Sequence, residues 1–524
     1  MRDHTDLSMK RELYKRSFFI ITAIILLFSF LIRSFYLSSS PPGFFADEAA
    51  IGYNAYKLLT NGADEYGVRL PIFFQSFGDY RLPIPIYANI PFVALFGLTE
   101  VSVRMTAIFF GLVSIFFLML FMRELRGNLA GLCMGFLLMI LPWHIHLSRW
   151  GSEYMYFPAF LSISLYFYVK SMKKPMFLTL SFVFLALTLY TYYPSLFITP
   201  LFLLAVILHT FSSQQHNRKR LAIACMIFLL LCIPLYLGYK NKTLMTRWNS
   251  VNAEKTSFSK KLLKGLSVYK DAYSPKFLFF KGDIGMPEHF VARHSVRGFG
   301  QLSLFQIILL PLGIILSLRK SRKGDVRLML WLLLLYPLGS AITNDGILAT
   351  RSVIGIIPLT FFSTVGLTAV CMWLLKKRYV AIRIFCAFAG AVIVLVSVFM
   401  YLHAFYKEYP LYSADFWGWQ FGPKPIMQYF LKNKNAYDDL YMSGEFNGAT
   451  IFPKFYDPTN ICQNKCKIGD FMRNPEIYDP SRRQLFSLSP DYLDRSGYEQ
   501  KFQTKKFIFY PNGTVAFKIG VIVQ

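Results

Sequence analysis

The chain has 524 residues, of which 54% are hydrophobic, 18% aromatic and only 16% charged. Soluble domains carry about a quarter of charged residues, so this composition excludes an ordinary soluble protein and indicates a polytopic membrane protein. The net charge of +27 does not indicate nucleic-acid binding, because the basic residues lie in short linkers between apolar runs.

The N-terminal segment is polar and basic up to residue 17, and an apolar run follows over residues 17–37. This run is long enough to span a membrane. A basic start before an apolar stretch is also typical of a signal peptide, but the run is long for one and no Ala-x-Ala cleavage site follows. We therefore expect an uncleaved first helix with its N-terminus in the cytoplasm.

Two adjacent carboxylates, Asp47 and Glu48, follow where the first helix should leave the bilayer. Charges at that level are tolerated when they face a water-filled cavity. The structural alternative is that Asp47 is the N-cap of a helix over residues 49–59 that stops at Gly62. The two roles are compatible, so both stay open at this point.

Further apolar runs follow at residues 83–98, 103–122, 129–147, 154–169, 176–192, 195–211, 220–238, 303–318, 326–342, 352–375 and 380–402. Several linkers between them are rich in Lys and Arg, whereas those around Trp150, Tyr192 and Asn344 are poor in both. The positive-inside rule places the rich linkers on the side of the N-terminus. Parity then requires that one early run does not cross. The run 83–98 is short and proline-rich, so we expect about eleven transmembrane helices and an outer C-terminus.

The hydropathy falls after residue 402, which predicts two domains: a helical membrane domain over 1–402 and a small soluble α/β domain over 403–524. In the second, Pro511-Asn512-Gly513 between two apolar segments indicates a β-hairpin. Cys462 and Cys466 can pair in an oxidising compartment or remain thiols. The other cysteines lie in apolar runs.

Acids and arginines gather in the linkers that this topology places on the outer face. A carboxylate at the lipid–water boundary beside arginines suits group transfer from a lipid phosphate, because Arg binds phosphate through forked donors and a carboxylate can act as general base. Structural alternatives are headgroup anchoring for Arg81 and Arg149, interfacial placement for His144 and His146, and a structural turn at Asp283. Motifs for serine acyl transfer, nucleotide binding and zinc are absent from the sequence.

Six short stretches carry a family resemblance. They are Ala46-Asp47-Glu48-Ala49, Asp79-Tyr80-Arg81-Leu82-Pro83, residues 95–104, Trp143-His144-Ile145-His146-Leu147-Ser148-Arg149, Phe279-Phe280-Lys281-Gly282-Asp283 and Ala349-Thr350-Arg351. Their order resembles the GT-C glycosyltransferases, in particular bacterial relatives of the protein O-mannosyltransferases and of the lipid A aminoarabinose transferase. The resemblance implies that Asp47 is the catalytic carboxylate, with Glu48 beside it and Glu153 as the acid of the second outer loop. It implies a donor-phosphate contact for Arg81. Arg149 and Arg351 are further candidates for that phosphate, and His144, His146 and Asp283 are candidates without an assigned role.

The resemblance therefore implies a glycosyltransferase of the bacterial inner membrane with a periplasmic C-terminal domain. Its donor is expected to be a polyprenyl-phosphate sugar and its acceptor a lipid, polysaccharide or protein, with inversion at the sugar carbon. A divalent metal stays open, and no nucleic-acid partner is expected. The rivals are a transporter or flippase of lipid-linked sugars, which needs ionisable residues near mid-membrane, and a non-catalytic assembly protein.

Overall fold

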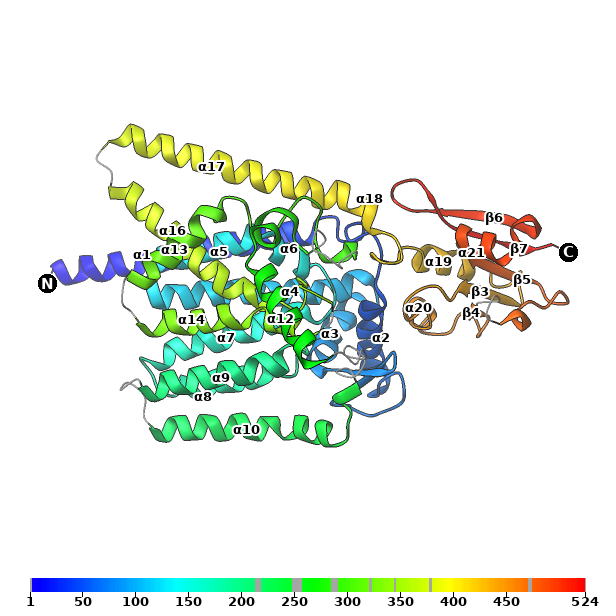
Figure 1. Cartoon of the computed structure of the whole chain (residues 1–524), viewed down its shortest axis with the longest axis horizontal. Helices are drawn as coiled ribbons and strands as arrows, with labels where there is room; N and C mark the ends of the chain where they lie inside the picture. The colour runs from blue at the N-terminus through cyan, green and yellow to red at the C-terminus, as the bar shows by residue number, and fades with distance from the viewer. Residues whose placement is uncertain are drawn as a thin grey trace.

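The computed structural model describes residues 2–212, 218–246, 257–283, 291–319, 323–343, 345–376, 379–469 and 474–523. Helices running in roughly one direction form a bundle, and a small unit with a β-sheet lies at one end of it (Figure 1). The mainly helical class and the C-terminal sheet agree with the sequence-based expectation. Asn344, which belongs to a predicted outer linker, lies outside the described residues.

The long helices of the bundle follow the predicted apolar runs closely. Their bounds are α1 (Arg2–Ser34), α4 (Glu100–Arg126), α5 (Asn128–Ile140), α7 (Tyr156–Ser171), α8 (Phe177–Thr188), α9 (Ser195–Ser212), α10 (Arg218–Lys240), α13 (Gln306–Arg319), α14 (Lys323–Leu335), α16 (Ile356–Lys376) and α17 (Val380–His403). Among the described residues, five segments are long and apolar enough to cross a membrane, or up to six if the bent pair of α5 and α6 (Pro142–Ser148) is one span. The chain is a multi-pass membrane protein, and the count of about eleven spans stays a prediction.

Shorter elements connect these helices. They are α2 (Ala46–Asn61), β1 (Phe74–Ser76), β2 (Asp79–Arg81), α3 (Pro83–Phe96), η1 (Glu153–Met155), α12 (Phe258–Ala272), η2 (Lys276–Lys281), η3 (Ala292–His294), α15 (Leu338–Ala341), η4 (Val353–Gly355), η5 (Ala404–Glu408) and α18 (Tyr409–Ser413). Figure 1 shows α2 lying across the end of the bundle. It stops at Gly62, as predicted, where φ is 66°, a value that glycine adopts without strain. The run 83–98 forms the short apolar helix α3.

The C-terminal unit contains a five-stranded sheet in the order β4-β3-β5-β7-β6. Its elements are α19 (Pro423–Asn433), β3 (Asp439–Ser443), α20 (Ile451–Tyr456), β4 (Cys466–Gly469), η6 (Pro475–Ile477), β5 (Gln484–Leu488), α21 (Pro490–Ser496), η7 (Glu499–Lys501), β6 (Phe502–Phe509) and β7 (Val515–Ile522). The predicted hairpin is confirmed, because β6 and β7 pair antiparallel across its turn. Cys462 and Cys466 form a disulfide, which was one of the two outcomes left open.

The C-terminal unit shares a hydrophobic core with the segment around α2. Phe44 and Ala49 belong to the same buried cluster as Phe452 and Phe455, and the rings of Phe44 and Phe455 lie 4.8 Å apart. A Cβ at Gly52 would stand 2.9 Å from the Phe455 ring, so α20 approaches α2 closely only because residue 52 is glycine. The segment from Phe44 to Gly52 is therefore held between the bundle and the C-terminal unit.

Candidate active site

The start of α2 separates the two carboxylates. The first helical residue is Ala46 and the N-cap is Phe45, whose side chain caps nothing. The Glu48 carboxylate instead accepts the Phe45 N–H at 3.0 Å, as the third helical residue does in a capping box. The hypothesis that Asp47 is the N-cap is therefore wrong. The helix begins earlier than residue 49, and Asp47 points its carboxylate elsewhere.

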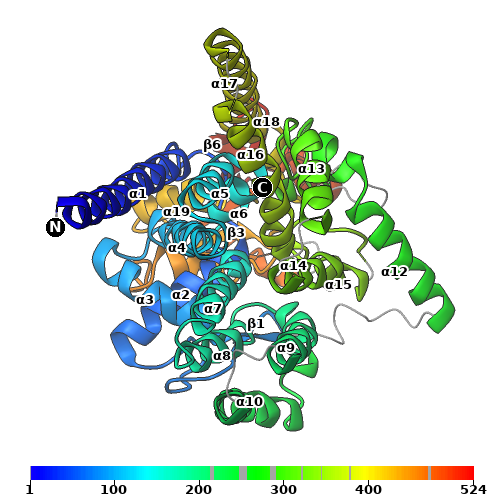
Figure 2. The ribbon, with the colours of Figure 1, turned by 90° about the vertical axis from the view of Figure 1, so that its left-hand side faces the viewer.

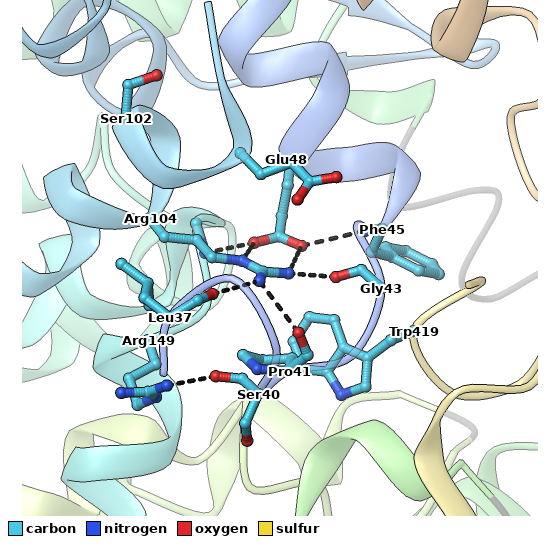
Figure 3. Close-up of polar contacts among 12 residues, drawn as sticks. Leu37, Ser40, Pro41, Gly43, Phe45, Glu48, Ser102, Arg104, Arg149 and Trp419 are labelled. Carbon is cyan, nitrogen blue, oxygen red and sulfur yellow. Dashed lines mark hydrogen bonds and ion pairs between the residues drawn. The ribbon is translucent and has the colours of Figure 1, made fainter. Parts of the chain in front are cut away.

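Glu48 is the anion of a fully buried ion pair. Its Oε1 lies 3.1 Å from Nε of Arg104, and neither side chain has any exposed surface. It also accepts the Gly151 N–H at 2.9 Å. Figure 3 shows the Arg104 guanidinium between Glu48 and the turn before α2, where it donates to the carbonyl oxygens of Leu37, Pro41 and Gly43. Every polar atom of this pair is occupied, which favours a structural role for Glu48 over the expected catalytic one.

Asp47 belongs to a second, partly open cluster. Arg81 places Nη2 at 2.6 Å from Oδ1 of Asp47 and Nη1 at 3.3 Å from Oε2 of Glu153. The side chains of Asp47 and Glu153 keep 21% and 16% of their surface exposed. Burial lowers the pKa of Arg81, but the two carboxylates outweigh it and hold that pKa above its ordinary value. The guanidinium therefore stays charged, and it joins two sequence-predicted acids.

The hairpin β1–β2 positions Arg81. Its turn is formed by Phe77 and Gly78, both with positive φ, and it pairs Ser76 with Asp79. The Arg81 Nε–H donates to Ser76 Oγ at 3.0 Å, which fixes the direction of the fork. Helix α3 then begins at Pro83, the position at which proline is favoured in a helix.

Two adjoining cavities lead away from this cluster. Arg81 and Glu153 line a small one of about 20 Å³. Glu153 also lines a cavity of about 590 Å³, with Arg351 in its wall. The remaining lining is mostly apolar and comes from the region of α9, α10 and α15. Tyr192 and Tyr193 line both cavities. Neither tyrosine was expected at the site, because tyrosines near a helix end also suit an interface belt.

Arg351 is held at the wall of the larger cavity. Its Nη1 lies 2.5 Å from Oδ2 of Asp345 and donates to Thr343 Oγ1 at 2.6 Å. Its side chain is 17% exposed. Asp283 is fully buried and accepts the Ala349 N–H at 2.8 Å, so it fixes the loop that carries Arg351. This agrees with the structural alternative for Asp283.

Arg149 and His144 are structural in this arrangement. Arg149 is fully buried and donates to the carbonyl oxygens of Arg33 and Ser40. The His144 Nδ1 lies 2.9 Å from a guanidinium nitrogen of Arg33, and its Nε2 lies 2.9 Å from Ser114 Oγ. Because arginine can only donate, Nδ1 accepts and the ring is neutral. Their burial among protein groups favours structural roles over the expected phosphate contact of Arg149 and the interfacial placement of His144.

His146 and Arg293 form a third buried contact near α2. His146 is 4% exposed, and its Nε2 donates to the Arg293 carbonyl at 2.6 Å, which favours a structural role for this residue as well. The Arg293 guanidinium lies 4.1 Å from the centre of the Phe45 ring and donates to the Trp417 carbonyl at 2.8 Å. Burial lowers its pKa. Sequence reasoning missed Arg293 as a neighbour of α2, because a basic residue in a long loop carries no distinguishing signal.

A divalent cation has two acids available here. Asp47 and Glu153 face the same guanidinium, and no group of three His, Cys, Asp or Glu side chains gathers in the described part of the chain. Mg²⁺ is often held by one or two carboxylates together with water and substrate phosphate. The pair fits that pattern only if Arg81 moves from between the acids.

The fold is similar to that of several solved structures. The chain is similar to ArnT from Cupriavidus metallidurans bound to undecaprenyl phosphate, with a TM-score of 0.55 and 13% identity over 96% of this chain and 97% of that one. It is also similar to the apo oligosaccharyltransferase of Archaeoglobus fulgidus, with a TM-score of 0.52 and 13% identity over 95% and 74%. A third similar structure is AglB from Archaeoglobus fulgidus in complex with an inhibitory peptide and a dolichol-phosphate, with a TM-score of 0.52 and 13% identity over 90% and 65%.

No family model and no curated protein matches the chain in sequence. At 12–13% identity the structural likeness concerns the fold alone. This likeness confirms the GT-C fold, which the family resemblance of the sequence motifs predicts.

Proposed function

We propose that this protein is a glycosyltransferase that moves a sugar from a polyprenyl-phosphate donor to an envelope acceptor. One observation carries the proposal: the Asp47–Arg81–Glu153 cluster adjoins, through Glu153, a mostly apolar cavity of about 590 Å³ with Arg351 in its wall. A lipid-linked phosphate needs an apolar channel for its chain and cations for its head. This cavity combines an apolar lining with the Arg351 cation, and the Glu153 carboxylate lies in its wall.

The donor class is supported by the similar structures. One was solved with undecaprenyl phosphate and another with a dolichol-phosphate. For this chain we assign the prenyl chain to the apolar part of the cavity and the phosphate to Arg351 and Arg81. Forked guanidinium groups suit phosphate oxygens better than a point charge does.

In the proposed reaction Asp47 is the general base. It takes the proton of an acceptor hydroxyl or amine, the acceptor atom forms a bond to the anomeric carbon, and the bond from that carbon to the phosphate oxygen breaks. The configuration inverts, and polyprenyl phosphate leaves with its charge paired to arginine. Asp47 is bound to Arg81 at 2.6 Å, so Arg81 must turn toward the phosphate for the base to act. Glu153, its second partner, keeps the guanidinium nearby.

We assign the reaction to the outer face of the bacterial inner membrane, with residues 1–402 as the transferase domain and 403–524 as a periplasmic domain. The Cys462–Cys466 disulfide suits an oxidising compartment. The C-terminal unit packs on α2 through Phe455, which supports a role in shaping acceptor entry rather than in chemistry.

The test uses purified protein in lipid nanodiscs with radiolabelled polyprenyl-phosphate sugars. Release of polyprenyl phosphate together with labelled acceptor from a membrane extract supports the proposal. Movement of intact donor between leaflets of proteoliposomes without cleavage supports the flippase alternative instead. Mass spectrometry of envelope lipids and glycans from cells carrying the wild type or Asp47→Asn then identifies the sugar and the acceptor.

A further inference from the structure

Helix α12 presents an apolar surface that is largely exposed in the described part of the chain. Leu262, Leu263 and Leu266 are 53%, 67% and 58% exposed. The helix sequence contains four lysines and one aspartate, and the lysines at 260 and 261 are also exposed. An apolar stripe flanked by lysines is typical of a helix that lies in the interface of a bilayer.

The opposite face of α12 is packed against the protein. Val268 and Ala272 are buried in the main core. A Cβ at Gly265 would stand 3.5 Å from the Ala341 carbonyl at the end of α15. The next two residues, Ile342 and Thr343, line the large cavity together with Arg351. Only the short helix α15 therefore separates α12 from the cavity wall that contains Arg351.

The direction of α12 also suits a helix that lies in the interface of a bilayer. Figure 2, which looks along the bundle, shows α12 at full length at the edge of the molecule, and Figure 1 shows it crossing the direction of the long helices. A helix that crosses the bundle direction at the periphery lies along a membrane surface rather than through it. Its lysines then stand at the level of lipid headgroups, where each adds to the attraction of anionic lipids.

We infer that α12 is an interfacial helix that binds anionic lipid headgroups beside the entrance of the large cavity. Its leucines enter the acyl boundary, and Lys260 and Lys261 bind phosphate groups. Lipid binding by α12 stands independently of the proposed transferase activity. The added consequence, that α12 raises the local concentration of an anionic lipid donor at the Arg351 wall, rests on that proposed function.

The first experiment tests lipid contact without any activity assay. Cys133, Cys225, Cys232, Cys371 and Cys386 are replaced by alanine, the disulfide is kept, and a bimane label is attached at Leu262→Cys or, as the matched control, at Ser267→Cys. Five residues turn a helix by about 140° from one position to the other. In nanodiscs containing brominated lipid we expect quenching at position 262 and iodide access at position 267. Equal iodide access and no bromine quenching at position 262 would overturn the inference.

The second experiment tests the lysines. The double variant Lys260→Gln/Lys261→Gln is compared with Lys505→Gln/Lys506→Gln, which removes two neighbouring charges from β6. In nanodiscs with phosphatidylglycerol, we expect co-purified anionic lipid to fall about threefold or more for the α12 variant only. Unchanged lipid in the α12 variant contradicts the inference. The apparent KM for a lipid donor should rise with unchanged kcat. If lipid falls and no transfer is found in the wild type, only the proposed function fails.

Discussion

Asp47 and Glu48 are neighbours in one turn of α2, and each pairs with an arginine, but the two pairs differ in burial and in partners. The Glu48–Arg104 pair has no exposed surface, whereas Asp47 and Arg81 keep 21% and 12%. Successive helix residues point about 100° apart, so one carboxylate enters the core and the other faces the cavity side. Burial, rather than charge or sequence position, therefore separates a structural acid from a candidate catalytic one.

The partners of the two arginines explain why only one cluster can work on a substrate. Arg104 donates to Glu48 and to three backbone carbonyls of the turn before α2, so moving it would strand several buried groups. Arg81 is shared between two acids beside a cavity. When one acid releases it, the other still pairs with it. Arg81 can therefore change partners at a lower cost in free energy than Arg104, whose donors are all bound to buried groups.

The largest effect should come from breaking the buried pair. Arg104→Met leaves the Glu48 carboxylate buried without its cation, and this should cost about 3–5 kcal/mol of folding free energy. Thermal unfolding in detergent, followed by tryptophan fluorescence, should show a large fall in Tm and a loss of monodisperse protein. The double variant with Glu48→Leu should recover part of the stability, because the stranded charge is gone. A single variant that melts like the wild type would contradict the structural role.

The next effect concerns the open cluster and activity rather than stability. Asp47→Asn keeps the size of the side chain and removes the base, so transfer should fall roughly a hundredfold or more. The Tm should stay close to that of the wild type, since Arg81 keeps Glu153. Glu48→Gln is the matched control: it should lower the yield of folded protein while the folded fraction turns over. Near-normal turnover of Asp47→Asn would move the search for the base to Glu153.

A smaller effect is expected across the cavity, at Arg351. Arg351→Ala removes a cation that we assign to the donor phosphate, and losing a charged hydrogen bond should raise the apparent KM for donor about tenfold. Arg351→Lys should recover only part, because lysine lacks the planar fork. Steady-state kinetics at several donor concentrations measure both. Unchanged donor kinetics in Arg351→Ala would remove this residue from the site.

The sequence predicts much of the fold because its signals are local. Apolar runs between basic linkers predict the helices within a few residues, and Pro511-Asn512-Gly513 predicts the hairpin. The sorting of Asp47 from Glu48 depends instead on Arg104, which lies 56 residues along the chain from Glu48. An arginine inside an apolar run needs a partner, and that was the available signal. The roles of Arg149 and His144 could not be predicted, because the partners that bury them, backbone carbonyls for Arg149 and Arg33 and Ser114 for His144, leave no local pattern in the sequence.

The smallest effect is expected at an ion pair beside α2 of which only the cation is exposed. Lys454 of α20 lies 2.8 Å from Glu65, and the lysine side chain is 42% exposed. Because Lys454 is partly exposed and Glu65 keeps another donor, Lys454→Met should cost less than the roughly 3–5 kcal/mol expected for Arg104→Met. The Glu65 side chain is only 6% exposed, but after the substitution it keeps the amide of Asn54 at 3.1 Å as a donor. Thermal unfolding of Lys454→Met beside Arg104→Met, in the same detergent, gives the ranking directly. A fall in Tm as large as that of Arg104→Met would show that the contact of α20 with α2, rather than burial of the charges, governs the stability of the segment around α2.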